Sequence, residues 1–220
     1  MRTKTLLIAG AALAATVISP EAQTVYSVNV VGYANVVLPG GGAYSLIANP
    51  FDDGNGNQLT NILSSTFANK SQVLTWNPGL GGYDPAIIKA GGAWPSSVSL
   101  PPGVGFFVKN ATTTPVTNTF VGTIVVASGN KGTNALPVNY SLVGSQVPYA
   151  GDAATDTNIN LLATLANKSQ LLGWDPVSQS YTPADIKAGG SFPTNFPVAV
   201  GQGFFIKNNT ATNWIQSLQP

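Results

Sequence analysis

The chain has 220 residues, with nine Lys or Arg, eight Asp or Glu, and no His or Cys, which gives a net charge of +1. This balance leaves no basic face for nucleic acid and no polybasic patch for a membrane surface. Without histidine and cysteine, the chain lacks Ser-His-Asp triads, imidazole and thiolate metal ligands, thiol nucleophiles and disulfides.

Residues 1–22 have the pattern of a secretory signal peptide. A basic start (Arg2 and Lys4) precedes the apolar run 6–18, which is shorter than the ~20 residues that a bilayer span needs. We predict cleavage after Ala22 and export to the medium or the cell surface. The mature chain then has lysine as its only cation and aspartate as its only acid, and no later apolar run is long enough to span a membrane.

An internal repeat organises the rest of the chain. Residues 67–110 align without a gap with residues 165–208, and about half of the aligned positions are identical. This period is longer than the roughly 20–50 residues of a solenoid unit. We therefore predict a mainly β protein with two tandem copies of a small antiparallel sandwich or barrel, at 23–126 and 127–220, each with one short helix. A single pseudo-symmetric β-barrel is the alternative.

Strand signals in the first copy are short apolar segments bounded by Pro, Gly or Asn, at 44–50, 72–78 and 104–110. The Pro-Pro-Gly of 101–103 predicts a type II turn, and the Gly91-Gly92 pair predicts another reversal. The second copy repeats this pattern.

One helix is predicted in each copy, ending at Ala68 and Ala166. The asparagine after each of these alanines is suited to a left-handed C-cap, and Asp156 or Thr157 is suited to the second N-cap. The residues at helical spacing are Leu59, Ile62, Leu63 and Phe67 in the first copy, and Ile159, Leu162, Leu165 and Ala166 in the second.

The segment TNTFVGTIVV (117–126) resembles the opening segment VVGYANVV (30–37). It is therefore a candidate strand for both copies. On this interpretation the copies share a sheet edge and unfold together.

Alternation of side chains along a strand places Leu74 and Trp76 on one face. It likewise separates Phe106, which we expect in a core, from Phe107 on the other face beside Lys109. We expect a neighbouring element to cover Phe107 and its counterpart Phe205 while the lysine stem extends to solvent, although a ligand platform is the alternative. Trp76 and Trp174 are expected in the core.

Candidate ligand-binding residues are Tyr83, Trp94 and Tyr181. They occur in turn-rich segments, so we expect them to be exposed and available to stack on sugar rings, beside Asn and Asp as hydrogen-bonding groups.

A candidate metal site is formed by Asp53, Asn55 and Asn57, whose alternate spacing lets one loop wrap oxygens around calcium. Gln58 occupies the place where an EF-hand has glycine, and no glutamate follows to close the shell. The alternative is a Gly/Asn-rich turn before the helix. No other cofactor is predicted.

Three groups of motifs resemble a family of secreted, β-rich proteins of environmental bacteria, of the planctomycete and verrucomicrobial type. They are VYSVNVVGYANV, the pair YSLIANPF and YSLVGSQVP, and the two GxGFF segments. The resemblance covers nearly all of the mature chain and implies an exported β-rich module. Members often have glutamate between the glycines of GxGFF, where this chain has Val104 and Gln202.

These observations favour a non-catalytic secreted module, acting as a structural component of the cell surface or matrix and able to self-associate. A carbohydrate-binding module, with an extracellular polysaccharide as partner, is the alternative. An enzyme is the third option and would be a glycosidase that pairs two aspartates.

The signal-peptide interpretation predicts that the exported chain begins near Gln23, because the cleavage site follows Ala22. Mass spectrometry of secreted material measures this directly. Exported protein that retains Met1 would contradict the interpretation.

Overall fold

The computed structural model describes residues 31–95, 98–126 and 131–218 and confirms a mainly β protein made of antiparallel sheets. Over these ranges the strands form separate sheets and no closed barrel, so the barrel alternative is wrong. The signal peptide predicted at 1–22 lies outside the described residues.

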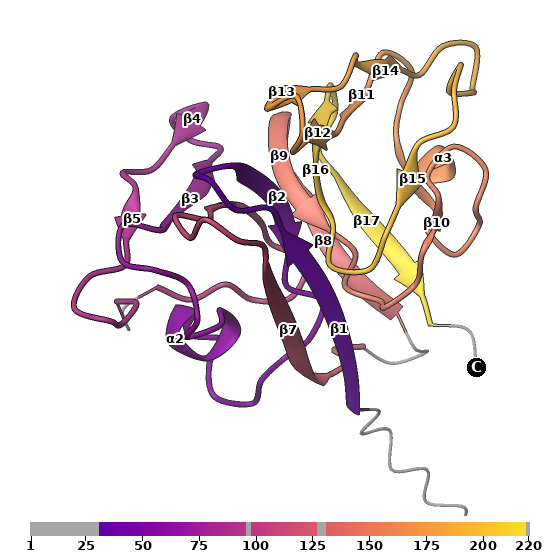
Figure 1. Cartoon of the computed structure of the whole chain (residues 1–220). Coiled ribbons are helices and arrows are strands. Elements are labelled where there is room, and N and C mark those ends of the chain that lie inside the picture. Colours follow the sequence, from indigo (N-terminus) through magenta and orange to yellow (C-terminus); the bar gives the residue numbers. More distant parts are fainter. Residues whose placement is uncertain (1–30, 96–97, 127–130, 219–220) are drawn as a thin grey trace, which may run out of the picture.

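The first half consists of a two-stranded ribbon, a larger sheet and one helical turn (Figure 1). Strands β1 and β7 form the ribbon, and β2-β6-β3-β4 form the sheet in that order, with β5 paired to β3. The elements are β1 (Val31–Leu38), β2 (Tyr44–Ala48), α2 (Leu59–Ile62), β3 (Gln72–Asn77), β4 (Gly82–Tyr83), β5 (Ile87–Ile88), β6 (Gly105–Lys109) and β7 (Val116–Thr123).

The second half repeats this plan. Strands β8 and β17 form its ribbon, β14-β11-β16-β9 form its sheet, and β10-β15 and β12-β13 are short pairs. The elements are β8 (Lys131–Leu136), β9 (Asn139–Gly144), β10 (Gly151–Asp152), α3 (Leu161–Thr164), β11 (Gln170–Leu172), β12 (Trp174–Asp175), β13 (Ser180–Tyr181), β14 (Asp185–Ile186), β15 (Pro197–Val198), β16 (Gly203–Asn208) and β17 (Thr212–Ser217).

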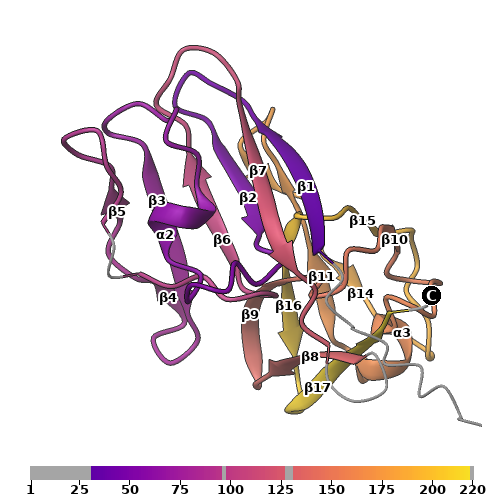
Figure 2. The same cartoon turned by 90° about the horizontal axis from the view of Figure 1, so that it is seen from below.

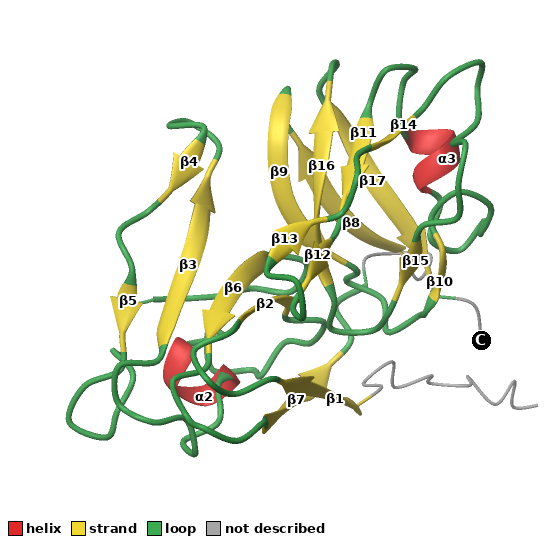
Figure 3. Ribbon diagram, turned by 45° about the horizontal axis from the view of Figure 1, so that its top comes forward, coloured by secondary structure: helices red, strands yellow, loops and turns green. Residues whose placement is uncertain are grey.

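Each half has its own apolar core between the ribbon and one face of the sheet. In the first half, Phe106 and Val108 of β6 pack with Phe120 of β7. In the second half, the ring of Phe204 in β16 lies 5.7 Å from the ring of Trp214 in β17, centroid to centroid. Figure 3 shows the two short helices well separated, one in each half. Each half is thus a small sandwich.

No strand is shared between the halves within the described ranges. Strand β7 pairs with β1 along its full length, from Val116 opposite Leu38 to Thr123 opposite Val31. The second half opens with its own strand, β8, which pairs with β17. The prediction that 117–126 serves both copies is therefore wrong.

The halves meet through the other face of each sheet. Phe107 and Phe205 are buried there, which confirms that a neighbouring element covers them. The ring of each phenylalanine lies against the tryptophan of the opposite half, Phe107 at 5.0 Å from Trp174 and Phe205 at 5.1 Å from Trp76. The further residues of this cluster are Leu46, Leu142, Tyr44, Tyr140, Leu74 and Leu172.

Hydrogen bonds across this interface occur in equivalent pairs, which shows that an approximate two-fold axis relates the halves. The indole N–H of Trp76 donates to the carbonyl of Tyr140 at 2.9 Å, and that of Trp174 donates to the carbonyl of Tyr44 at 2.8 Å. The backbone repeats the pattern, since Ala48 N donates to Gly201 O at 2.9 Å and Gly144 N donates to Gly103 O at 3.0 Å. These directional hydrogen bonds thus fix the relative orientation of the halves, in addition to the apolar contact between them.

The helices are shorter than predicted. Helix α2 ends at Ile62 rather than Ala68. Leu63 N still donates to Leu59 O, but the following amide, Ser64 N, donates to the side chain of Asn118 at 2.8 Å and so leaves the helical pattern. Helix α3 begins at Leu161, and Asp156 instead accepts the amide N–H of Asn158 in the preceding turn.

The predicted C-caps are also displaced by one residue. The left-handed positions are Lys70 (φ 73°) and Lys168 (φ 69°), not Asn69 and Asn167. The asparagine side chains instead accept the amide N–H groups of Gly92 and Gly190, at 2.9 and 3.0 Å, and so tie each turn to the glycine reversal.

The shared interface predicts that the halves unfold together, in one calorimetric transition. Replacing Phe107 by alanine should lower the free energy of unfolding by about 3–5 kcal/mol, because a buried ring is removed from the interface. As a control, Val177→Ala, at a residue that is 88 % exposed and belongs to no proposed contact, should change it by less than about 0.5 kcal/mol. Two well-separated transitions in the unmodified protein would contradict a shared interface.

Candidate functional site

Aromatic side chains from both halves form one cluster at the interface, and two predicted ligand residues belong to it. Tyr83 on β4 lies 5.3 Å from Trp76, and Tyr181 on β13 lies 5.1 Å from Trp174, between ring centroids. The two phenol oxygens are 2.5 Å apart, so one hydroxyl donates to the other across the approximate two-fold axis. The tyrosines thus connect the tips of two hairpins.

This setting changes the acidity of Tyr83. Tyr83 is 37 % exposed, and its partial burial raises the pKa of the phenol above the ordinary value. Both the hydrogen bond to Tyr181 and the proximity of that second phenol raise it further. Tyr83 is therefore harder to deprotonate than an ordinary tyrosine.

Two small clefts flank the tyrosine pair, and they are equivalent under the approximate symmetry. One, of about 280 Å³, is walled by Trp76, Tyr140, Leu172, Tyr181 and Phe205. The other, of about 300 Å³, has the matching walls Tyr44, Leu74, Tyr83, Phe107 and Trp174, and Tyr181 lines it as well. Their aromatic walls suit an apolar surface or the flat face of a sugar ring.

Trp94 lies apart from this cluster, and the prediction that it is exposed is wrong. Only 5 % of its surface is exposed, and its ring packs 5.9 Å from that of Phe67 in the core of the first half. The Gly91-Gly92 reversal turns the chain back and brings Trp94 against its own module. Tyr83, Trp94 and Tyr181 therefore do not form one common surface.

Two buried lysines, which sequence reasoning did not single out, hold the loops that follow the helices. The amine of Lys89 donates to the carbonyls of Ser65 and Phe67, both at 2.6 Å, and lies 5.9 Å from the ring of Trp94. Lys187 donates to the carbonyl of Leu162 within α3, at 2.6 Å, and to that of Leu165 just after it. The repeated sequence Ile-Lys-Ala-Gly-Gly was the available signal, and the role is structural.

The predicted calcium loop is organised by its own hydrogen bonds. The carboxylate of Asp53 accepts the amide N–H groups of Asn55 and Asn57, both at 2.8 Å, and the side-chain amide of Asn61 at 3.0 Å. Burial by itself would raise the pKa of Asp53, but these donors outweigh it and the pKa is lowered. In the described part of the chain, no group of three or more His, Cys, Asp or Glu could hold a metal ion. Calcium binding stays a prediction.

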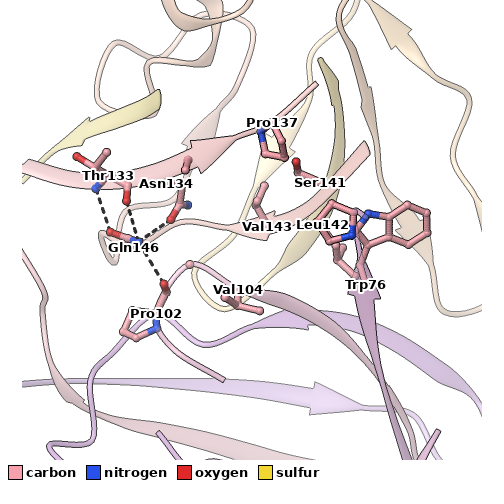
Figure 4. Close-up of a pocket in the computed structure, with 13 residues that line it drawn as sticks. Trp76, Pro102, Val104, Thr133, Asn134, Pro137, Ser141, Leu142, Val143 and Gln146 are labelled. Atoms are coloured by element: carbon pink, nitrogen blue, oxygen red, sulfur yellow. Dashed lines mark hydrogen bonds between the residues drawn. The ribbon is translucent and has the colours of Figure 1, made fainter. Parts of the chain in front are cut away.

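A third cleft, of about 300 Å³, opens between the halves beside Trp76 (Figure 4). Gln146 lines this cleft. Its side-chain amide donates to the carbonyl of Pro102 at 3.2 Å and to the side-chain oxygen of Asn134, so it connects the two halves. No acidic or basic side chain lines this cleft, whose walls are described in full. It offers hydrogen-bonding groups for a neutral ligand but no acid or base for catalysis.

The aspartates, with one exception, accept hydrogen bonds from residues close to them in the chain. Asp84 accepts the hydroxyl of Thr75 at 3.0 Å and the amide of Asn77 at 2.9 Å. The others in this class are Asp52, Asp53, Asp152, Asp156 and Asp175. The exception is Asp185, which is buried and accepts no hydrogen bond from any described residue.

The outer face of the β1/β7 ribbon is an exposed apolar surface. Strands β1 and β7 run side by side (Figure 2), and the residues that point away from the core lie opposite one another in register. Val31, Tyr33, Val37 and Val121 are 68, 75, 64 and 57 % exposed. We call this the outer ribbon face. It consists of these four residues with Asn35, Thr117 and Thr119.

Comparison with protein-family models, with curated proteins and with solved structures finds no match for this chain. Neither of the helices in the described ranges has the length and apolar character of a membrane-spanning segment.

The tyrosine pair predicts a change of stability with pH. The ordinary pKa of tyrosine is 10.0, and that of Tyr83 is higher in the folded protein. The folded state therefore holds this proton where the unfolded state releases it, so the stabilisation is complete below pH 10 and declines as pH rises above it.

Melting temperatures from pH 8 to 11 test this, since Tyr83→Phe should reduce the alkaline decline by removing the titrating group. Tyr149→Phe, a tyrosine outside the cluster, serves as the control. Identical alkaline declines in the Tyr83→Phe variant and the unmodified protein would contradict the assignment.

Proposed function

We propose that this chain is a non-catalytic structural module of the extracellular surface or matrix, which associates with a second copy through the outer ribbon face. The observation that carries the proposal is the row of exposed apolar residues on β1 and β7, each more than half exposed. Isolated exposed apolar residues are normal on a protein surface, but a contiguous patch marks an interaction site.

The chemistry of this face favours a second copy of the chain as the partner. None of its side chains is charged, so no charged partner is specified, and the chain as a whole has a net charge of only +1. Little charge repulsion opposes the approach of two identical molecules. When this face contacts the same face of a second copy, the interface is closed and two-fold symmetric. Tyr33 and Val121, which lie opposite each other in register, then contact the same two residues of the partner copy.

The equivalent ribbon of the second half supports this assignment by contrast. The outer side of β8 and β17 begins with Lys131 and is otherwise mostly polar, with Ile215 as its one large apolar residue. The two ribbons thus have the same fold and different surfaces. Because the fold is common to both ribbons, the fold does not explain why only the first ribbon is apolar on its outer side.

The hydrogen bonds of the aspartates support a non-catalytic function. The described aspartates other than Asp185 hold their own loops, and the sequence has no histidine or cysteine. The extracellular location rests on the predicted signal peptide and on the resemblance to secreted β-rich bacterial proteins.

Carbohydrate binding is the second candidate, and the pair of aromatic clefts beside Tyr83 and Tyr181 favours it. A glycan array with the mature protein separates the two functions. Saturable binding that is lost in Tyr181→Ala would support the second candidate, because this side chain borders both clefts.

Self-association is tested by light scattering coupled to gel filtration, over a range of protein concentrations. We expect a dimer whose fraction rises with concentration. Tyr33→Lys should raise the dissociation constant at least about tenfold, because each copy would bring a positive charge into the apolar contact.

Ile215→Lys is the matched control, since it places the same charge at the outer side of the second ribbon. It should leave the dimer unchanged. A protein that stays monomeric at every concentration, or equal losses in the two variants, would show that the outer ribbon face is not the contact.

A further inference from the structure

A pocket of about 380 Å³ lies in the second half, away from the outer ribbon face. Trp174 and Phe196 supply aromatic walls, and Thr182, Thr194 and Asn195 supply polar groups. Asp185 contributes the only charged side chain to the lining. The pocket is mostly apolar with a few polar groups, which is the usual composition of a small-molecule site.

Asp185 is unusual among the acids of this protein. Its side chain is only 5 % exposed, and neither carboxylate oxygen has a hydrogen-bond partner among the described residues. Lys187, two residues further along the chain, directs its amine to the carbonyls of Leu162 and Leu165 instead. A buried carboxylate without a partner is costly, so its presence calls for a ligand or another donor.

Comparison with the first half shows that this carboxylate is not needed for the fold. The aligned residue there is Ile87, which packs against the first core. The two residues occupy equivalent strands, β5 and β14, which pair in the same way with β3 and β11. An apolar side chain therefore satisfies the structure at this position, and the second half has a carboxylate in its place.

A second difference between the halves lies beside this pocket. Gly173 aligns with Thr75, whose hydroxyl in the first half donates to Asp84. A side chain at Gly173 would begin 3.2 Å from the hydroxyl of Thr182 and 3.8 Å from the ring of Phe196. The glycine thus lets Thr182 lie close to the backbone, where its hydroxyl accepts the amide N–H of Gly173 at 2.9 Å.

We propose that this pocket binds an organic ammonium group, with Asp185 as its counter-ion and Trp174 and Phe196 against its apolar body. A buried carboxylate attracts a cation more strongly than an exposed one, because water screens the charges less. Aromatic faces add attraction for an ammonium group. A metal ion fits less well, since calcium takes about six to eight oxygen ligands and this lining has one carboxylate between aromatic and proline walls.

The shared chemistry is a primary ammonium, which either an amino sugar or a lysine side chain supplies. Calorimetric titration of the purified protein with glucosamine, N-acetylglucosamine and Nα-acetyl-lysine methylamide distinguishes them. Glucosamine and the lysine derivative both test the charge. N-acetylglucosamine keeps the sugar and lacks the cation. Binding of glucosamine alone identifies an amino-sugar site, whereas binding of both ammonium probes identifies a general ammonium site.

Two variants test the role of Asp185. Asp185→Asn keeps the shape and should weaken ammonium binding at least about tenfold. Asp185→Ile installs the residue of the first half, and should abolish binding while raising the melting temperature, because the unpaired charge is gone. A merely structural aspartate would not give these opposite effects. No binding by either ammonium probe, equal binding of N-acetylglucosamine, or unchanged affinity in Asp185→Asn would overturn the proposal, and none of these results depends on self-association.

Discussion

Each of the two larger sheets has two apolar faces, and the need to bury the second face holds the protein together. Adjacent phenylalanines on β6 and β16 point to opposite sides, so a half that folded alone would leave Phe107 or Phe205 in water. Burying such a ring stabilises the protein by about 1.5–3 kcal/mol. The indole N–H groups of Trp76 and Trp174 then find carbonyl acceptors only in the opposite half. The four layers, ribbon, sheet, sheet and ribbon, follow from this one contact.

The features that indicate function lie where the two halves depart from the approximate symmetry. The interface is nearly symmetric because both copies bury the same face, and the buried lysines Lys89 and Lys187 hold equivalent loops. The differences lie elsewhere. One ribbon is apolar outside and the other is mostly polar, and one position has Ile87 in the first half and the unpartnered Asp185 in the second. Local features that do not serve the fold are expected where a protein binds something.

Strand alternation was the reliable part of the sequence analysis. It separated Phe106 from Phe107, and it placed Leu74 and Trp76 on one face, which the structure confirms. Helix length was not predictable, because Asn118, distant in the sequence, takes the amide that would continue α2. The prediction that Trp94 is exposed is wrong for a similar reason, since a turn-rich segment can fold back over its own core. Asp185 gave no signal beyond its alignment with Ile87.

The mainly β class, the duplication and the chemical limits set by the absence of histidine and cysteine follow from the residues alone, because they depend on local periodicity and on composition. Which faces of the sheets are covered depends instead on how distant segments pack in the folded chain. Tyr83 and Tyr181 are 98 residues apart, and nothing local to either one predicts that their hydroxyls meet. The same holds for the outer ribbon face and for the pocket at Asp185. Exposure and pairing depend on which distant segment packs against a residue, and that contact exists only in the folded chain.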